Sequence, residues 1–283
     1  MNSEFELIEQ FFKSQAHRED VLRGVGDDAA VLRLPANTDI VVTVDTLIEG
    51  VHFPPQTDPQ SIGHKALAVN LSDLSAMGAE PAWITLALTM PCANEIWLAD
   101  FCRGLFGLAR AFNVDLVGGD LTRGELSITV QAMGFSQRTK TIGRDGARPG
   151  DALFVTGYVG DAGLALASIK GAVHTDPSAQ AYCLSRLNRP TPRVRAGMAL
   201  RDLASAAIDI SDGLVADLEH LLVASNTGAT RRQRRSMPSR FELVMSHLAF
   251  VVPSVIPHHL RRRRLRHRPR HRRPVPRRPV HPA

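Results

Sequence analysis

The chain has little cysteine, no long apolar run and no motif typical of covalent catalysis. Its three cysteines, Cys92, Cys102 and Cys183, lie far apart without a CxxC pair, which argues against a disulfide framework or a cysteine zinc site. No segment approaches the roughly 18 consecutive apolar residues that a membrane-spanning helix needs. The acidic N-terminus also lacks the basic region of a secretory signal. We therefore expect a cytoplasmic protein that makes no use of a membrane.

Positive charge is scarce in most of the chain, although the net charge is +6. Residues 231–283 hold sixteen arginines, no lysine and one acid, which leaves 18 basic and 27 acidic side chains in residues 1–230. Arg, Pro and His make up 30 of these last 53 residues. Such a segment buries too little apolar surface to offset its conformational entropy, so we expect a largely disordered tail. Its arginines would bind nucleic acid only non-specifically, through the phosphates, which we interpret as an accidental property.

Alternating strand and helix patterns before Thr230 predict a mixed α/β fold. The pattern favours strands at 40–45, 82–90, 114–119, 126–135 and 206–210, and helices at 59–77, 95–112 and 211–224. The segment RPGDALFVTG at 148–157 begins what looks like a second domain. We predict an N-terminal domain over 1–137, the beginning of a C-terminal domain over 138–229, and the tail over 230–283.

Aspartates carry the chemistry of this sequence. Seven of them stand where predicted elements meet loops: Asp27, Asp28, Asp45, Asp73, Asp120, Asp209 and Asp212. Strand ends form one mouth of an α/β sheet, so we expect these acids to converge. Two carboxylates 4 Å apart repel by about 4 kcal/mol at an effective dielectric near 20. A cluster of this kind needs hard cations, and an all-oxygen set suits Mg²⁺ shared with phosphate oxygens, which predicts metal-assisted phosphoryl transfer.

Asp73 is the most informative of these acids, because it falls on the apolar stripe of its predicted helix. Burying an unpaired carboxylate costs several kcal/mol, so it needs a cation or a set of hydrogen bonds. A lone Asp-Asp pair is more often a solvated turn, and only the joint pattern favours a metal site. His52 and Arg144 are candidates for substrate and phosphate contacts, although such residues are more often structural or solvated.

Two glycine-containing motifs give weaker evidence of function. GVGDDA at 24–29 matches G-x-G-x-x-A but would place two acids against a pyrophosphate, and TGYVGDAG at 156–163 more often serves packing. The absence of GxxxxGK[ST] excludes a P-loop enzyme. No covalent nucleophile or general base stands out, so we assign none.

Six segments occur in an order and spacing that resemble a known family. They are GDDAAV, TVDTLIEGVHF, KALAVNLSDLSAMGAEP, VGGDLTRG, IGRDGARPGD and IDISDGLVADL. Over about residues 1–229 they resemble the thiamine-monophosphate kinases, within the aminoimidazole ribonucleotide synthetase-like superfamily. The resemblance implies that ATP phosphorylates thiamine phosphate to thiamine diphosphate with Mg²⁺. It also implies a homodimer, an N-terminal ATP-binding α/β domain of that superfamily's type, and a C-terminal α/β domain that closes over the site.

The resemblance further implies roles for individual residues. The implied magnesium ligands are Asp27, Thr43, Asp45, Asp73, Asp120, Asp209 and Asp212, with a backbone contribution at Val44. The implied ATP contacts are Gly119, Asp120, Arg144 and Ser211. His52 would contact thiamine phosphate.

The chain departs from the family after SNTGAT at 225–230. The acidic GGEDYEL-like segment and the later aromatic residues that would hold the thiamine end do not appear, so the C-terminal domain is expected to be incomplete. Our hypothesis is a frameshift near codon 230, since Arg, Pro and His share C-rich codons. Two superfamily alternatives stay open: a hydrogenase-maturation protein, and a selenophosphate synthetase, which usually has a reactive Cys near its N-terminus, where the first 90 residues here have none.

Overall fold

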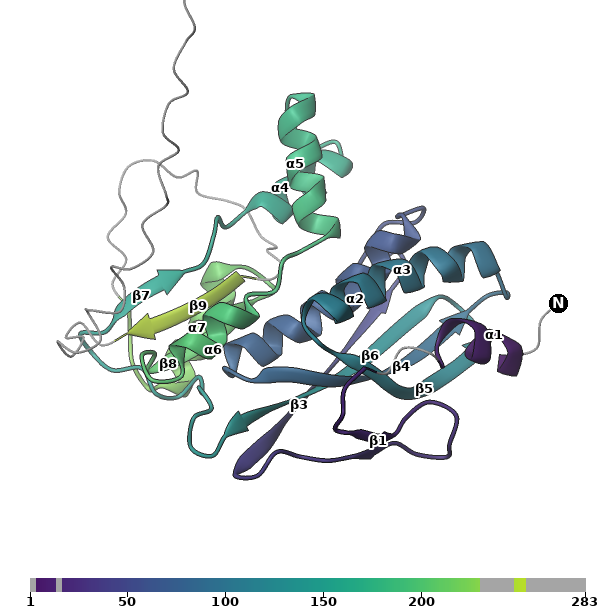
Figure 1. The fold of residues 1–283 in the computed structure, drawn as a ribbon. Coiled ribbons are helices and arrows are strands. Elements are labelled where there is room, and N and C mark those ends of the chain that lie inside the picture. Colours follow the sequence, from purple (N-terminus) through teal and green to yellow (C-terminus); the bar gives the residue numbers. More distant parts are fainter. Residues whose placement is uncertain (1–3, 14–16, 230–246, 253–283) are drawn as a thin grey trace, which may run out of the picture.

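The structure, a computed structural model, describes residues 4–13, 17–229 and 247–252. Helices and strands are interspersed along the chain, and the strands form a four-stranded sheet, a three-stranded sheet and a short two-stranded pair (Figure 1). The elements are α1 (Glu4–Phe11), β1 (Val21–Arg23), β2 (Val31–Leu32), β3 (Thr38–Ile48), α2 (Pro59–Ala76), β4 (Glu80–Met90), α3 (Glu95–Ala111), β5 (Asp115–Arg123), β6 (Ser127–Gln137), β7 (Ala152–Val155), α4 (Asp161–Ile169), α5 (Pro177–Asn188), α6 (Val194–Leu200), β8 (Ala206–Ile210), α7 (Leu214–Ala224) and β9 (His247–Val252).

The larger sheet has four strands in the order β3-β6-β4-β5. Only β4 and β5 run parallel, and β3 pairs with β6 along its whole length. Helices α2 and α3 cover one face of this sheet (Figure 1). Strands β3 and β5 are the two edge strands, so residues on β3 are separated from residues on β5 by the width of the sheet.

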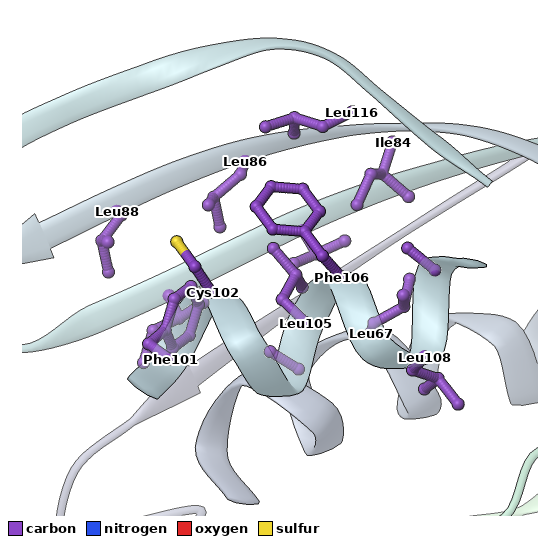
Figure 2. Close-up of a cluster of buried hydrophobic side chains, with 14 of the residues drawn as sticks. Leu67, Ile84, Leu86, Leu88, Phe101, Cys102, Leu105, Phe106, Leu108 and Leu116 are labelled. Carbon is purple, nitrogen blue, oxygen red and sulfur yellow. The ribbon is translucent and has the colours of Figure 1, made fainter. Parts of the chain in front are cut away.

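The main core lies between this sheet and helices α2 and α3. Figure 2 shows the side chains of Leu86 and Leu88 from the sheet facing Phe101 and Leu105 from α3, all of them buried. The two helices cross at very short range, because a Cβ on Gly104 would lie 1.8 Å from the Gln60 carbonyl oxygen. Backbone contact at this crossing therefore positions α2 firmly on the sheet.

The short β1–β2 hairpin covers part of the opposite face of the sheet. Val21 and Leu32 pack against Trp83 and Phe135 there. The indole nitrogen of Trp83 also donates a hydrogen bond of 3.0 Å to Asp20, beside the start of β1. This face is therefore closed at the hairpin.

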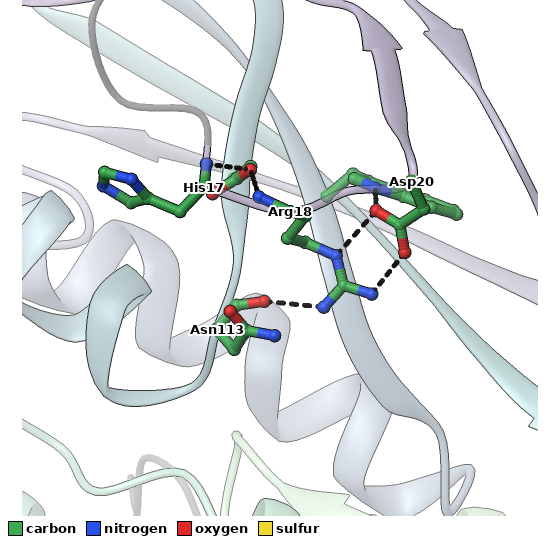
Figure 3. A network of polar contacts seen from close by, with 6 residues as sticks. His17, Arg18, Asp20 and Asn113 are labelled. Carbon is green, nitrogen blue, oxygen red and sulfur yellow. Dashed lines mark hydrogen bonds and ion pairs between the residues drawn. The ribbon is translucent and has the colours of Figure 1, made fainter.

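A polar network fixes the segment that leads into the hairpin (Figure 3). The buried carboxylate of Asp115, at the start of β5, accepts hydrogen bonds of 2.7 Å from the backbone N–H groups of His17 and Arg18. The Arg18 guanidinium binds both carboxylate oxygens of Asp20 and the backbone oxygen of Asn113. The segment is thereby tied to the edge of the sheet.

The smaller sheet corrects one expectation from composition. Its order is β7-β9-β8, so the central strand β9 lies inside residues 230–283, which we expected to be largely disordered. The strand forms because Ala249 and Val251 bury themselves beside Ile208 and Ile210, and because β9 pairs along both of its edges. The expectation for residues 230–246 and 253–283 lies outside the described residues.

Two details of the predicted elements also differ. Strand β3 extends to Ile48, so Asp45 lies within it, and Asp120 lies in the middle of β5. The expectation that these acids end strands at one mouth of a sheet is therefore wrong, because continuous pairing with β6 and β4 carries both strands further. Helix α7 begins at Leu214, and not at Ser211. The helix that starts after the N-cap residue Asp58 agrees with its prediction.

The larger sheet ends with β6, and the strands from β7 onward belong to the smaller one. The three domain ranges stay predictions. Within the part of the chain that is described, no helix is both long and apolar enough to cross a membrane.

Candidate active site

A pocket of about 280 Å³ lies where α2 and β3 of the larger sheet meet β8 of the smaller one. Four aspartates from distant parts of the chain reach it. Its lining residues are Asp45, Thr46, Leu47, His52, Val69, Ser72, Asp73, Asp209, Ser211 and Asp212. Six predicted site residues are thus brought together between the two sheets, and not at the mouth of one sheet.

The carboxylates in this pocket repel one another. Burial, together with the charge of Asp73, raises the pKa of Asp45 to about 6. Burial and then the charges of Asp73, Asp217 and Asp45 raise the pKa of Asp209 to about 7. Such carboxylates hold their charge at neutral pH only at an electrostatic cost, which a bound cation would remove.

Asp73 is held at the centre of this cluster by its neighbours. Burial raises the pKa of Asp73, and hydrogen bonding from Thr43 and the positive charge of Arg144 offset part of that rise. The Thr43 hydroxyl donates a hydrogen bond of 2.6 Å to the Asp73 carboxylate. Thr43 therefore reaches the site through Asp73, from two residues before Asp45 on the same side of β3.

The turn after β8 places Ser211 and Asp212 through a residue that the sequence reasoning missed. Asp217 is buried, and its carboxylate accepts hydrogen bonds of 2.9, 3.2 and 3.1 Å from the backbone N–H groups of Ser211, Asp212 and Gly213. The signal was an acid in the first turn of the helix that follows DISDG, where carboxylates bind free N–H groups. Ser211 lies two residues before the N-cap position, Gly213, so it belongs to the turn that Asp217 holds and not to the helix.

His52 enters the pocket on a tight turn after β3. The backbone N–H of Ile48 donates a hydrogen bond of 3.0 Å to Nδ1 of His52. A neutral ring whose Nδ1 accepts a hydrogen bond carries its own hydrogen on Nε2. His52 therefore offers an N–H donor at Nε2, which suits a phosphate oxygen.

The donor set of this pocket fits magnesium. Asp45, Asp73, Asp209 and Asp212 supply carboxylate oxygens, and the raised pKa values of Asp45 and Asp209 show that charge at these two buried groups lacks compensation. Within the described ranges, no three His, Cys, Asp or Glu side chains stand ready to hold one ion by themselves. Mg²⁺ does not need such a set, because it keeps several waters and takes phosphate oxygens as further ligands. The four aspartates therefore fit magnesium ions that are bound by both the protein and the phosphate groups of a nucleotide.

Three predicted site residues lie elsewhere. Asp27 is exposed and forms an ion pair of 2.6 Å with Arg23. Gly119 and Asp120 line a second, apolar pocket with Ile8 of α1 and with Phe12, which follows that helix. The expected convergence of all the acids within one chain is therefore limited to four of them.

Sheet register explains this separation. Asp45 lies opposite Val130, Val130 opposite Leu86, and Leu86 opposite Gly119. Asp45 and Gly119 are thus level with one another but on opposite edges, about 14 Å apart at a normal strand spacing. The Val44 side chain points away from the pocket and is 58% exposed, so only its backbone could take part.

Arg144 lies in the loop between β6 and β7. Its backbone oxygen accepts a hydrogen bond of 2.6 Å from the Ser225 hydroxyl, which ties the loop to the end of α7. Its side chain is exposed, and its charge offsets part of the rise that burial causes in the pKa values of Asp73 and Asp209. The guanidinium is therefore free to bind a phosphate close to the carboxylate cluster.

Comparison with known proteins connects this geometry to a family. Residues 26–136 match the family model described as AIR synthase related protein, N-terminal domain. The thiamine-monophosphate kinase of Salmonella typhimurium is 47% identical over 228 residues, which are 80% of this chain and 70% of the relative.

Solved structures agree. The thiamine-monophosphate kinase of Stenotrophomonas maltophilia K279a is 43% identical, with a TM-score of 0.75 over 84% of this chain and 82% of that one. AaThiL complexed with AMPPCP and TMP is 31% identical, with a TM-score of 0.67 over 81% and 80%. A hydrogenase maturation protein, HypE, in complex with ATP matches at 19% identity and a TM-score of 0.69, covering 90% and 79%, which shows a shared fold alone.

Proposed function

This chain belongs to the thiamine-monophosphate kinase family, and we propose on that basis that it transfers the γ-phosphoryl group of ATP to thiamine phosphate. The products are thiamine diphosphate and ADP. The observation that carries the proposal is the pocket in which four aspartates and His52 meet between the two sheets. AaThiL, complexed with AMPPCP and TMP, supports the same pair of substrates.

The reaction needs positioning and charge compensation more than acid–base chemistry. An oxygen of thiamine phosphate forms a bond to the γ-phosphorus of ATP, while the bond from that phosphorus to the β–γ bridging oxygen breaks. The electron pair of the broken bond leaves with ADP. The acceptor oxygen is already ionised at neutral pH, so no side chain has to remove a proton. This explains why no general base is assigned.

The side chains of the pocket divide this work. Asp45, Asp73, Asp209 and Asp212 would hold Mg²⁺, with Asp73 oriented by Thr43. When bound, magnesium supplies neutralisation and alignment of the phosphate oxygens. His52 donates its Nε2–H to the phosphate of thiamine phosphate. Arg144 and Ser211 contact the phosphates of ATP.

We propose a homodimer that joins through strand β3. This strand is an edge of its sheet, and its outward side chains are apolar and 41–58% exposed, namely Ile40, Val42, Val44 and Ile48. A long apolar edge strand is a template for pairing with another chain. A second copy of this chain is the occupant that also accounts for the residues missing from the pocket.

In such a dimer, each site would draw residues from both copies. Gly119 and Asp120 lie at the edge opposite Asp45 within one chain. If the β3 edge of one copy lies beside the β5 edge of the other, these residues join the carboxylates at a shared ATP site. The roles of Gly119 and Asp120 therefore belong to the dimer in this proposal, and the role of Asp27 stays a prediction. A cytoplasmic location is proposed from cysteine usage, with Cys92, Cys102 and Cys183 all free thiols.

The decisive experiment measures thiamine diphosphate formed from thiamine phosphate, ATP and Mg²⁺ by the purified chain. We expect turnover that falls at least about 100-fold in Asp73→Asn. Asp176→Asn is the matched control, because Asp176 caps α5 away from the pocket and Asn caps as well as Asp. ATP hydrolysis without thiamine diphosphate, or equal rates in Asp73→Asn and wild type, would overturn the proposal.

A second experiment tests why the sequence differs from the family after residue 230. Sequencing the gene tests whether a one- or two-base shift near codon 230 recovers a GGEDYEL-like frame. If it does, we expect the frame-restored protein to bind thiamine phosphate more tightly than this chain. If no shift recovers such a frame, the frameshift hypothesis fails while the kinase proposal stands.

A further inference from the structure

We propose that Lys65 is a positioning residue for thiamine phosphate, which fixes the turn that carries His52 into the pocket. The inference rests on the proposed function and extends it to a residue that the phosphoryl-transfer chemistry does not use. It stands on one hydrogen bond, on the burial of the ammonium group and on the place of Lys65 in α2.

Lys65 lies within α2 and is only 2% exposed. Its ammonium donates a hydrogen bond of 2.7 Å to the backbone oxygen of His52. Among the described residues, no carboxylate forms an ion pair with it. The hydrogen bond of this buried cation therefore goes to one backbone carbonyl group, in the turn that carries His52.

This placement is unfavourable for stability. Burial lowers the pKa of Lys65 to about 8, because the charged form loses its hydration. A well-packed apolar side chain of similar volume at such a position is commonly as stable or more stable. A packing role therefore does not account for an ammonium group here, whereas orientation of the His52 turn does.

The turn itself is held mainly by short-range hydrogen bonds. His52 N–H donates to the Ile48 oxygen at 2.9 Å, and Gly50 N–H donates to the Phe53 oxygen at 2.8 Å. Gly50 has a φ of +77°, which suits glycine. These bonds shape the turn, and the buried Phe53 at its end packs into the main core, which also contains side chains of α2. The Lys65 hydrogen bond adds a polar link from α2 to the backbone of His52 itself.

Lys65 also connects the turn to the carboxylate cluster. Lys65, Val69 and Asp73 follow one another at intervals of four residues, so they lie along one side of α2. Val69 and Asp73 both line the pocket. The helix that holds Asp73 therefore also holds the backbone of His52, and the spacing between the acceptor phosphate and the carboxylates is set through Lys65.

The test replaces Lys65 with an apolar side chain of similar length, Lys65→Met. We expect the KM for thiamine phosphate to rise about ten-fold and the KM for ATP to change less than about two-fold. The melting temperature should not fall, since an unpaired buried charge is removed. Ser75→Ala is the matched control, because it deletes a hydrogen bond of 2.6 Å from another buried α2 side chain, and it should leave both KM values unchanged.

A second readout does not depend on turnover. Nitrogen NMR of the His52 ring should show one tautomer, with the hydrogen on Nε2, in wild type and a mixture in Lys65→Met. If wild type makes no thiamine diphosphate, the proposed function fails, and the ring spectra still decide the role of Lys65. An unchanged ring spectrum in Lys65→Met overturns the inference. Unfolding of Lys65→Met also overturns it, because the ammonium would then hold the fold and not the substrate turn.

Discussion

At the scale of single residues, Asp73 dominates the electrostatics of the pocket. After burial, its charge is the largest cause of the raised pKa values of both Asp45 and Asp209, and it receives the Thr43 hydrogen bond. A site that gathers like charges stores instability that ligand binding later relieves. Removing this one charge should therefore affect stability and ligand response in opposite directions.

We predict that Asp73→Asn melts at a higher temperature than wild type near pH 8 without magnesium, because the repulsion between carboxylates is reduced. The gain in melting temperature on adding Mg²⁺ should shrink in the same variant. Calorimetry of both proteins with and without Mg²⁺ measures both effects. A lower melting temperature for magnesium-free Asp73→Asn would contradict this account.

The raised carboxyl pKa values also predict how stability depends on pH. Asp45 and Asp209 have folded-state pKa values of about 6 and about 7, above the ordinary value of 3.8. Between the ordinary pKa and the raised pKa, the folded state binds more protons than the unfolded state. The contribution of Asp45 and Asp209 to the free energy of unfolding therefore falls as the pH rises from about 4 to about 6 and 7. Below about pH 4 that contribution is fully present.

Magnesium should reverse that trend, because it competes with protons for the same oxygens. We expect the Mg²⁺-induced rise in melting temperature to be small near pH 5 and large near pH 8. Thermal melts across this range measure it, with Asp73→Asn as the variant in which the dependence weakens. A magnesium effect of equal size at both ends would show that these carboxylates do not bind the ion.

At the scale of elements, the crossing of α2 and α3 positions the helix that carries Asp73 and Lys65. A Cβ on Gly104 would overlap the Gln60 carbonyl oxygen at 1.8 Å, whereas a Cβ on Gly107 in the same helix meets nothing within 4 Å. The two glycines therefore form a matched pair, one at the crossing and one exposed to solvent.

We predict that Gly104→Ala lowers the free energy of unfolding by about 1–3 kcal/mol, because the helices must move apart. Gly107→Ala should raise it by about 0.5–1 kcal/mol through helix propensity. Urea unfolding of both variants measures the difference. Similar effects in the two would show that the crossing is not tightly packed.

Strand β9 is the element on which the smaller sheet depends, since it pairs with both β7 and β8. We predict that a chain ending at residue 229 loses the order of that sheet, and that a chain ending at residue 252 keeps it. Hydrogen exchange of residues 206–210 separates these outcomes. Equal protection in both truncated chains would mean that β9 is dispensable.

The same pair of truncations separates the tail from the fold. Eleven of the sixteen arginines after residue 230 lie beyond residue 252. The chain ending at residue 252 should therefore bind DNA more weakly and with a shallower salt dependence than the full chain. Its Mg·ATP binding should not change.

At the scale of the whole molecule, the proposed dimer predicts complementation between inactive variants. Asp73→Asn and Asp120→Asn should each abolish turnover alone. If each site combines Asp73 of one copy with Asp120 of the other, mixed dimers contain one intact site. Random mixing should then restore about a quarter of wild-type activity. Turnover assays before and after subunit exchange measure this, and an absence of recovery would place both residues in one chain.

Local patterns allowed the sequence alone to identify the family, the chemistry and several element starts. Asp58 before a proline begins α2, and Asp73 lies on the side of that helix that meets the pocket, because caps and helical periodicity act within a few residues. The segments around the aspartates were sufficient to indicate the family that the comparisons support.

Only the tertiary structure decided which of these residues meet. Asp45 and Asp209 come together from two different sheets, whereas Asp120 lies across its sheet from Asp45. Strand pairing and burial depend on the whole chain, so spacing along the sequence does not predict them. For the same reason, the composition of the last 53 residues did not predict strand β9. Lys65 shows its role only through a hydrogen bond to a carbonyl thirteen residues away.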